Sequence, residues 1–468
     1  MAQTLFDKLW SAHLVEELGS GADLILIDRI MLHERTGGVA LKSLAAAGRN
    51  VMAPGQAFAT MDHVVDTFPG RGDETLMPTG RAFITATREA ALAAGLQLFD
   101  LADPRQGIVH VISPEQGIVL PGATLVCPDS HTCTQGAWGA LAWGIGSTEA
   151  EHALATSTLR VSRPKQMLIE VSGRLAPGVT AKDLALHILA ELSAAGASGH
   201  VVEFAGEAIE GLDLDGRQTL CNMATELAAF SAVIAPDERV FEYLNGRPFA
   251  PAGELWEQAV ASWRTLKSDH EAHYDHRIAI EAGQVAPMVT WGTSPQQAIP
   301  IGAPVPTYDE VADRDSREAY DRALEYMQLA SGGRLEELPI DAAFIGSCTN
   351  SRIADLRRAA AVLKGRKVAP GVKAICVPGS TSVKRQAEAE GLDRIFIEAG
   401  FEWRESGCSM CFFAGGESFG PRERVVSSTN RNFESRQGPE TRSHLASPET
   451  VAASAVMGRL ADPRGLAR

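Results

Sequence analysis

Residues 341–365 read DAAFIGSCTNSRIADLRRAAAVLKG, and this stretch decides the fold class. Its apolar start, 341–347, predicts a buried strand, and 354–365 predicts a helix closed by a glycine. The alternation continues directly, because 373–380 predicts a strand and turn and 383–391 predicts another helix. Strands and helices that alternate in this way are typical of α/β proteins with largely parallel sheets.

The same alternation extends outward through the rest of the chain. Apolar runs predict strands at 22–29, at 124–131, where the strand enters a polar loop, and at 165–173. Thr180 and Asp183 have the spacing of a capping box and predict a helix start. At the C-terminal end, SPETVAASAVMG predicts a helix with serine as the N-cap, proline at its first position and glycine beyond its end.

The length of 468 residues predicts two or three domains. The proline-rich stretch 296–310 is the best linker candidate, and a softer boundary lies near residue 163. We therefore expect domains at 1–163, 164–300 and 301–468.

Composition excludes several classes of function. The 58 acidic residues exceed the 43 basic ones and give a net charge of −15, which disfavours binding to nucleic acid. No stretch approaches the roughly 18 unbroken apolar residues of a membrane span, and charged residues interrupt the N-terminal segment where a signal peptide would be apolar. The seven cysteines are few and odd in number, so we expect thiols rather than a disulfide framework, in a soluble cytoplasmic protein.

Cys408 and Cys411, in ESGCSMCFFAGG, have a spacing that suits zinc, a redox disulfide or an iron–sulfur cluster. Zinc would need a second pair of ligands at short range, and the other cysteines are scattered. A thioredoxin-type pair usually has proline or tryptophan beside it, and this loop has neither. Cys348, in the loop after the strand 341–347, is the natural third ligand of a cluster, and three thiolates would leave one iron open. The alternative is that Cys348 is a small buried residue and the pair is incidental.

Histidines stand beside carboxylates in two loops that follow apolar runs. These are Asp62–His63 in MDH and Asp129–His131 in PDSH, and His110 ends QGIVH. A carboxylate next to an imidazole fixes its tautomer and raises its basicity, which suits it to proton transfer. A lone histidine is more often structural, but two such loops favour a catalytic interpretation.

Two arginines share the polar loop STNRNFESRQG. Each guanidinium of Arg431 and Arg436 could hold a carboxylate through two hydrogen bonds, as a di- or tricarboxylate substrate requires. A solvated turn that happens to contain arginine is the alternative.

Taken together, CPDSHT, FIGSCTNSRIADLR, GFEWRESGCSMC and STNRNFESRQG resemble the aconitase superfamily, and within it the large subunits of the two-subunit isopropylmalate dehydratases. The resemblance runs from about residue 4 to the C-terminus. It implies three α/β/α domains around a central cluster, without the swivelling domain of single-chain aconitases. It further implies that Cys348, Cys408 and Cys411 bind one 4Fe–4S cluster with one open iron.

The resemblance also implies roles for other side chains. Asp62 and His63 would protonate the departing hydroxide, Asp129 would orient His110, and Glu226 would orient His131. Contacts to substrate or to the cluster pocket are implied for His33, Ser130, Asn222, Asn430, Arg431 and Arg436.

The activity implied is a hydro-lyase reaction of leucine biosynthesis, in which 2-isopropylmalate and 3-isopropylmalate interconvert through 2-isopropylmaleate. We expect a small partner subunit that carries the swivel domain and completes the site in a heterodimer or larger assembly. An iron-responsive RNA-binding protein and an electron-transfer protein are alternatives, which the acidic charge and the lack of a fourth cysteine disfavour.

Several positions depart from the usual pattern of that branch and leave the hydroxy acid open. They are Ile30, the pair Gly37–Gly38, Cys127, Cys133, Ser435 and the segment 412–419. A related hydro-lyase that acts on 2-methylmalate (citramalate), dimethylmalate or homoaconitate is therefore the alternative.

Overall fold

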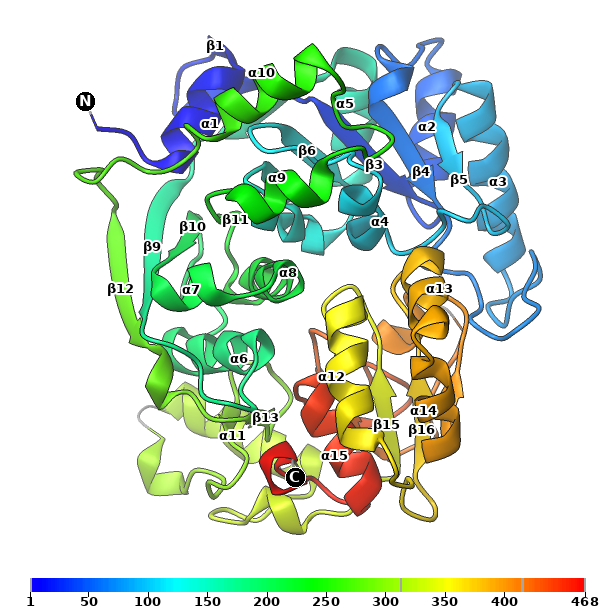
Figure 1. Ribbon diagram of the computed structural model, residues 1–468, viewed down its shortest axis with the longest axis vertical. Helices are drawn as coiled ribbons and strands as arrows, with labels where there is room; N and C mark the ends of the chain where they lie inside the picture. Colours follow the sequence, from blue (N-terminus) through cyan, green and yellow to red (C-terminus); the bar gives the residue numbers. More distant parts are fainter. Residues whose placement is uncertain (1, 312–313, 414–415, 467–468) are drawn as a thin grey trace.

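A computed structural model describes residues 2–311, 314–413 and 416–466, and its described part contains three parallel sheets in succession along the chain (Figure 1). The first sheet has the order β5-β4-β3-β6-β7, with every pairing parallel. Its strands are β3 (Arg29–His33), β4 (Ala57–Thr60), β5 (Gln97–Phe99), β6 (Thr124–Cys127) and β7 (Leu141–Gly144).

Helices cover both faces of this first sheet. Alternate side chains of β3 enter different cores: Met31 packs with residues of α4, whereas Ile30 and Leu32 pack with residues of α2 and α5. This two-sided burial is expected for a parallel sheet. The helices are α2 (Gly37–Ala46), α3 (Gly80–Ala93), α4 (Val109–Glu115), η2 (Ser130–Trp138) and α5 (Ser147–Thr156).

The second parallel sheet has the order β11-β10-β9-β12. The capping box of Thr180 and Asp183 starts helix α6, which confirms the prediction. The strands are β9 (Lys165–Ser172), β10 (His200–Ala205), β11 (Ser231–Val233) and β12 (His276–Glu281). The helices are α6 (Ala181–Leu192), α7 (Glu207–Gly211), α8 (Leu214–Met223), η3 (Ala224–Leu227), α9 (Glu238–Leu244) and α10 (Glu254–Trp263).

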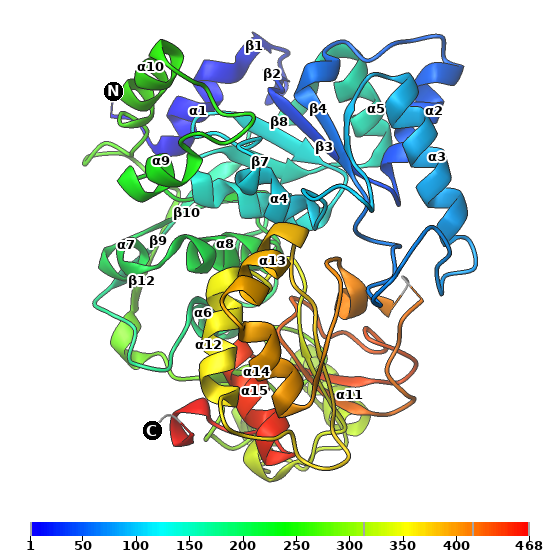
Figure 2. The same ribbon diagram turned by 45° about the vertical axis from the view of Figure 1, so that its right-hand side comes forward.

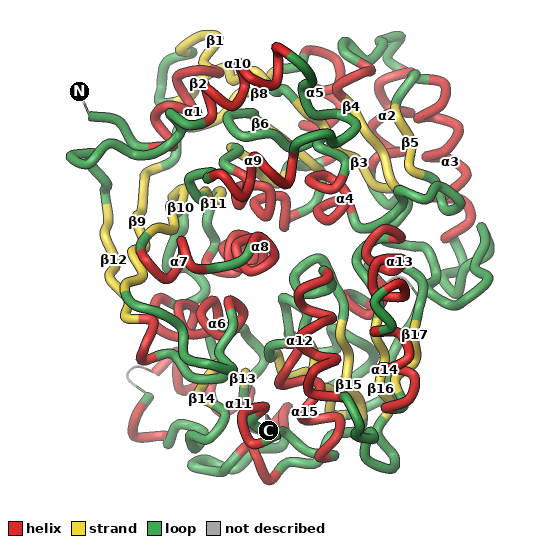
Figure 3. Tube along the Cα trace, viewed as in Figure 1, coloured by secondary structure: helices red, strands yellow, loops and turns green. Residues whose placement is uncertain are grey.

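The third parallel sheet has the order β17-β16-β15-β18-β19. Figure 3 shows the helices that flank it. The strand, loop and helix predicted in 341–365 are present, and Ser447 caps the final helix as predicted. The strands are β15 (Ala342–Ile345), β16 (Lys373–Cys376), β17 (Phe401–Trp403), β18 (Arg424–Ser427) and β19 (Arg442–Leu445). The helices are α12 (Ile353–Leu363), α13 (Thr381–Ala389), α14 (Leu392–Ala399), η7 (Ser409–Cys411) and α15 (Pro448–Met457).

The predicted strand at 22–29 is wrong as one element, because β2 ends before Asp28 and β3 belongs to another sheet. The Asp28 carboxylate accepts from the Thr124 backbone N–H and contacts His13, and these long-range contacts divide the apolar run. The other elements are α1 (Leu5–His13), β1 (Leu14–Glu17), β2 (Ala22–Leu26), η1 (Pro54–Gln56), β8 (Thr158–Ser162), η4 (Ala282–Gln284), β13 (Met288–Thr290), β14 (Ala298–Pro300), η5 (Tyr308–Glu310), α11 (Arg314–Met327), η6 (Leu335–Glu337) and η9 (Pro463–Gly465).

Each parallel sheet comes from one continuous part of the chain, 29–144, 165–281 or 342–445, and the domain division at 163 and 300 remains a prediction. The expected linker 296–310 contains β14, which pairs with β13. Among the described helices, none combines the length and apolar character needed to cross a membrane.

The two five-stranded sheets have the same topology and meet through their loops. In each, the first strand lies between the second and the fourth, which creates the switch point where α/β sheets bind ligands. Figure 2 places α4 of the first sheet beside α13 of the third. The loops join where Gly107 pairs with Ser380, and a Cβ on Gly107 would lie 2.5 Å from the Ser380 Cα. Only glycine permits this approach.

Candidate active site

A cavity of about 240 Å³ lies between the loops at the carboxyl ends of the first and third sheets. Its lining comes from segments that follow β3, β4, β5 and β6 on one side and β15, β17 and β18 on the other. Most of the side chains predicted from the sequence gather here. They are His33, His63, His110, Asp129, Ser130, His131, Cys348, Cys408, Cys411, Arg431 and Arg436.

The four remaining predicted residues lie one layer behind the cavity. Asp62 and Glu226 contact His63 and His131, and Asn222 and Asn430 donate to a cavity sulfur. The structure therefore brings the whole predicted set together, from segments of all three sheets.

Three sulfurs face the cavity. Cys348 follows β15, and Cys408 and Cys411 lie at the two ends of the η7 turn. The Ser347 hydroxyl is 3.9 Å from the Cys348 Sγ and 3.2 Å from the Cys411 Sγ, so these sulfurs are at most the sum, 7.1 Å, apart. Thiolate–metal bonds of about 2.3 Å place the sulfur ligands of a four-iron cluster roughly 6–7 Å apart. The bound for Cys348 and Cys411 is compatible with such a cluster, and the Cys408 sulfur lines the same cavity.

Polar groups also surround the sulfurs. The Asn222 and Asn430 amides donate to the Cys348 Sγ at 3.2 and 3.5 Å, and an Arg436 guanidinium nitrogen lies 3.7 Å from the Cys411 Sγ. Donors aimed at a ligand atom orient it and stabilise negative charge on it, as the outer shell of a metal site does. The donor set therefore suits thiolates.

All seven cysteines are unpaired and buried. Burial raises the pKa of Cys348 to about 12 and also raises the pKa of Cys408 well above its usual value. Without a cation these thiols would stay protonated, and a bound metal would deprotonate them. The cysteines are thus suited to binding a cationic group rather than to acting as catalytic thiols.

His63 lies between two carboxylates. Its Nδ1 is 2.6 Å from an Asp62 oxygen, and its Nε2 is 3.1 Å from an Asp129 oxygen. Burial opposes protonation of His63, but the negative charge of Asp62 is the next largest influence, and the pKa of His63 is raised well above its usual value. The protonated imidazole is therefore favoured, with Asp62 and Asp129 as the partners of its two ring nitrogens.

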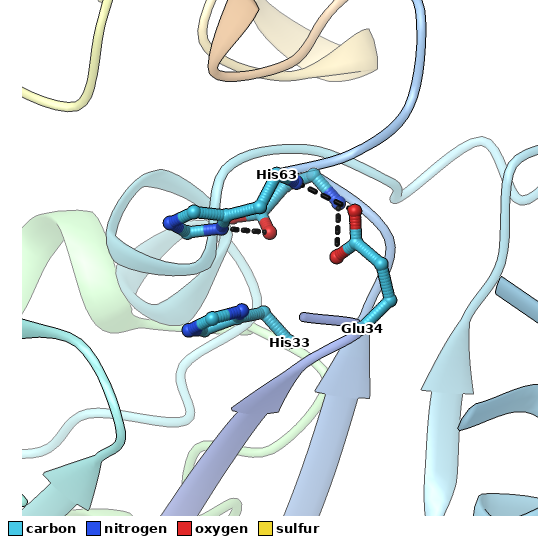
Figure 4. A group of neighbouring side chains, drawn as sticks. His33, Glu34 and His63 are labelled. Atoms are coloured by element: carbon cyan, nitrogen blue, oxygen red, sulfur yellow. Dashed lines mark hydrogen bonds and ion pairs between the residues drawn. The ribbon is translucent and has the colours of Figure 1, made fainter. Parts of the chain in front are cut away.

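His33 stacks on His63, with ring centroids 3.9 Å apart and an interplanar angle of 20° (Figure 4). Burial, and then the charge of His63, lower the pKa of His33 to about 4. His33 is therefore neutral, and its Nε2 contacts the Pro128 carbonyl oxygen at 3.1 Å. One ring of the stack carries charge and the other does not.

Glu34 is a functional candidate that the sequence reasoning missed. Its carboxylate accepts the backbone N–H groups of Asp62, His63 and Val64 at 3.0, 2.7 and 2.5 Å, as Figure 4 shows in part. Burial, and then the charge of Asp62, raise the pKa of Glu34 to about 7. Ligand atoms of His33, Glu34, Asp62 and His63 lie within 4.8 Å of one another, but the amides occupy both Glu34 oxygens. We interpret the group as a positioned loop rather than a metal centre.

Asp129 connects three histidines. Its carboxylate contacts the His110 Nε2 at 2.8 Å, accepts the His131 backbone N–H at 2.7 Å, and reaches His63. Burial disfavours its charged form, but His110 and the other hydrogen bonds outweigh burial and lower the pKa of Asp129 well below its usual value. Asp129 is thus ionised and holds the histidines in place.

His131 has a second carboxylate partner. Its Nε2 lies 2.9 Å from Glu226, and the same carboxylate contacts the Arg431 Nε at 2.9 Å. Burial opposes protonation of His131, but the hydrogen bonds of Asp129 and Glu226 raise its pKa. The Arg431 loop is supported by the buried Lys182, whose ammonium donates to the carbonyls of residues 428 and 429.

Arg436 is buried, and its Nε has no hydrogen-bond partner within the described residues. A buried, unpartnered guanidinium nitrogen is costly unless a ligand satisfies it. The cavity therefore suits an anion.

Further residues line the cavity without having been predicted, and most adjoin a predicted residue in sequence. They are Arg35, Thr36, Ile108, Pro128, Ser409 and Phe412.

The departures noted in the sequence fall into two groups. Phe412 lines the cavity, and Ser435 has a φ of 60°, so serine occupies a left-handed position where the related branch has glycine. Ala414 and Gly415, inside the departing segment 412–419, lie outside the described residues.

Other departures do not line the cavity, although Gly37 and Cys127 are next in sequence to the lining residues Thr36 and Pro128. Ile30 is buried in the core beside α2, and Gly37 begins α2. Cys127 and Cys133 are buried, and the Cys133 Sγ contacts the Cys221 carbonyl oxygen at 3.1 Å. Strand alternation explains why Ile30 does not line the cavity, because side chains at 30 and 32 face one side of the sheet and those at 31 and 33 face the other.

Comparison with known proteins agrees with this geometry. Residues 7–458 match the model of the aconitase family (aconitate hydratase). The chain is also 50% identical over 466 residues to "3-isopropylmalate dehydratase large subunit 1" of Bradyrhizobium diazoefficiens, covering 100% of this chain and 97% of that protein. The chain therefore belongs to the aconitase family.

Proposed function

We propose that this chain is the large, catalytic subunit of a cytoplasmic 3-isopropylmalate dehydratase, a hydro-lyase of leucine biosynthesis. The enzyme interconverts 2-isopropylmalate and 3-isopropylmalate through 2-isopropylmaleate. The observation that carries the proposal is one cavity that combines three thiols, carboxylate-bound imidazoles and guanidiniums. The full-length identity of 50% to a relative with that name supports the choice of substrate.

In this proposal Cys348, Cys408 and Cys411 would hold a 4Fe–4S cluster through three thiolates, with no fourth protein ligand. When bound, the cluster supplies a Lewis acid that polarises the bond between carbon and the departing oxygen. The sulfur spacing and the amide donors of Asn222 and Asn430 support this assignment.

His63 donates the proton that converts the departing hydroxide to water. Its raised pKa keeps that proton in place, and the Asp62 carboxylate stabilises the imidazolium until transfer. Asp129 then orients His110, and Glu226 orients His131, so that the polar wall of the cavity does not rotate during the reaction. His63 thus transfers the proton, whereas His110 and His131 are held in fixed orientations by their carboxylate partners.

Arg431 and Arg436 bind substrate carboxylates in this mechanism. Transfer of a C–H proton to a base, which the small partner subunit would supply, places negative charge on the neighbouring carboxylate, and an adjacent guanidinium stabilises the charge as it develops. The unpartnered Nε of Arg436 supports this role.

A small partner subunit carrying the swivel domain completes the site, as the words "large subunit" in the name of the relative suggest. The cavity side chains of His63 and Arg431 are partly exposed, and such a subunit would cover them. We expect the isolated chain to bind the cluster and to turn over substrate poorly.

The test is co-expression with the small-subunit gene of the same organism, followed by anaerobic assays of 3-isopropylmalate, citramalate, dimethylmalate and homocitrate-type acids. We expect the highest kcat/KM with 3-isopropylmalate. A preference of more than tenfold for another acid would replace the substrate but keep the reaction class. Full activity after complete removal of iron would refute the proposal as a whole.

A further inference from the structure

Three guanidiniums line the cavity, and their side chains have different partners among the described residues. Arg431 pairs with Glu226 at 2.9 Å, and Arg436 lies 3.7 Å from the Cys411 Sγ. Arg35 forms no ion pair or hydrogen bond with any residue in the described ranges, and its one recorded contact is with the Phe412 ring at 5.0 Å. Arg35 is thus a cavity guanidinium with neither an ion pair nor a hydrogen bond among the described residues.

The backbone explains why Arg35 reaches the cavity. It lies two residues beyond His33, the last residue of β3, and the side chain between them belongs to Glu34, which turns to the amides of residues 62–64. Residues 34–36 form a turn directly after β3, in which the Thr36 backbone N–H donates to the His33 carbonyl at 3.3 Å, and His33, Arg35 and Thr36 all line the cavity. The position of Arg35 thus follows from the turn that ends the strand carrying His33.

Phe412 fixes the guanidinium of Arg35 at this place. The ring also lies 4.7 Å from the guanidinium carbon of Arg436, so one aromatic ring contacts two cations. Each cation is attracted to the ring, but the two cations repel each other. An anion that reaches both guanidiniums would remove this repulsion.

We propose that Arg35 binds one carboxylate of the substrate, with the Phe412 ring as the surface that orients its guanidinium. This inference rests on the proposed function, in which a hydroxy diacid brings two carboxylates to the cavity. Arg431 already shares its charge with Glu226, so Arg35 joins Arg431 and Arg436 and adds the binding group that the second carboxylate needs. Residues 35 and 412 act together, since the ring without the cation, or the cation without the ring, would leave the second carboxylate poorly held.

The test uses the two-subunit enzyme with its cluster, and non-reacting probes. Succinate has two carboxylates, and butyrate has one on a chain of the same length. Calorimetry measures the Kd of both probes for wild type, Arg35→Met, Arg35→Lys and the control Arg49→Met. Arg49 is exposed just beyond α2 and outside the cavity, so its loss removes a nearby charge without touching the site.

We expect Arg35→Met to raise the Kd of succinate about 10- to 100-fold, as for loss of a hydrogen bond to a charged group. The Kd of butyrate should rise much less. Arg35→Lys should recover part of the loss, and Arg49→Met should match wild type. In turnover, KM should rise with kcat nearly unchanged, which marks uniform binding. Cluster absorbance and thermal midpoint should not change.

Equal loss for both probes, or no loss for either, would overturn the inference, as would a wild-type enzyme that does not prefer succinate. A variant that binds succinate normally but no longer assembles with the small subunit would assign Arg35 to the interface instead and would also overturn it. Turnover of 3-isopropylmalate by wild type tests the proposed function separately. The Kd of succinate tests the role of Arg35 even if wild type does not turn over 3-isopropylmalate.

Discussion

Removal of the Glu34 carboxylate should loosen the loop that carries the proton donor. The carboxylate accepts three consecutive backbone N–H groups, from residues 62 to 64, in a place where Asp62 is fully buried. A buried donor left without a partner costs about 1–3 kcal/mol. Glu34→Ala therefore destabilises the buried loop by several kcal/mol, and movement of the loop toward water would relieve that cost.

Movement of the loop displaces His63 from its position between Asp62 and Asp129. Misplacement of a catalytic group by about 1 Å can cost about 10²-fold in rate, so we expect kcat of Glu34→Ala to fall by about that factor. Glu34→Gln keeps the shape and one acceptor oxygen. That oxygen can still accept from residues 63 and 64, so only the Asp62 N–H loses its partner, and the loss should be smaller.

Hydrogen exchange measured by mass spectrometry, on a peptide that covers residues 61–65, tests the structural step directly. Exchange should be fastest in Glu34→Ala, intermediate in Glu34→Gln, and slow in wild type. The exposed Glu89 of α3 offers a control, since Glu89→Ala also removes a carboxylate. If exchange in the peptide and kcat are both unchanged in Glu34→Ala, Glu34 does not position the loop and the reasoning is refuted.

Three further outcomes are expected. His63→Ala should lower kcat by about 10²–10⁴ with cluster absorbance retained, as for loss of a general acid, and an unchanged kcat in steady-state assays excludes that role. Cys408→Ser should lose both activity and the broad cluster absorbance, and a variant that keeps the full absorbance removes Cys408 from the ligand set. Burial raises the pKa of Glu115 from 4.5 to about 7, so its ionisation destabilises the fold as pH rises from 4.5 to 7 and by a constant amount above that. Glu115→Gln should therefore raise the thermal midpoint more at pH 8 than at pH 5, and calorimetry that finds the reverse order contradicts the assignment.

Features set by neighbouring residues could be predicted from the sequence. The start of α6 depends on Thr180 and Asp183, three residues apart, and the start of α15 depends on Ser447 and the proline after it. The position of Cys348 directly after a strand suggested it as the third ligand beside the cysteine pair, with an incidental pair as the alternative. The resemblance to a family added the roles of Asn222, Glu226 and Asn430, which no local pattern links to the cavity.

Features set by distant or backbone partners could not be predicted. The break between β2 and β3 depends on contacts of Asp28 with Thr124, and nothing in the apolar run itself marks it. Glu34 binds backbone N–H groups, which every non-proline residue has, so its partners carry no sequence signal. For Arg35 the informative fact is that no partner exists among the described residues, and only the fold reveals that.

The joint between the two five-stranded sheets links cluster binding to proton transfer. The Cys408 backbone N–H donates to the Asp62 carbonyl at 2.8 Å, and the Cys408 Sγ is 3.9 Å from both the Asp62 carboxylate and the His63 Nδ1. A displacement of the loop at 62–64 therefore also moves a proposed cluster ligand. It follows that displacement of this loop, as expected for Glu34→Ala, should alter both the rate and the stability of the cluster, whereas Arg35→Met should affect substrate binding alone.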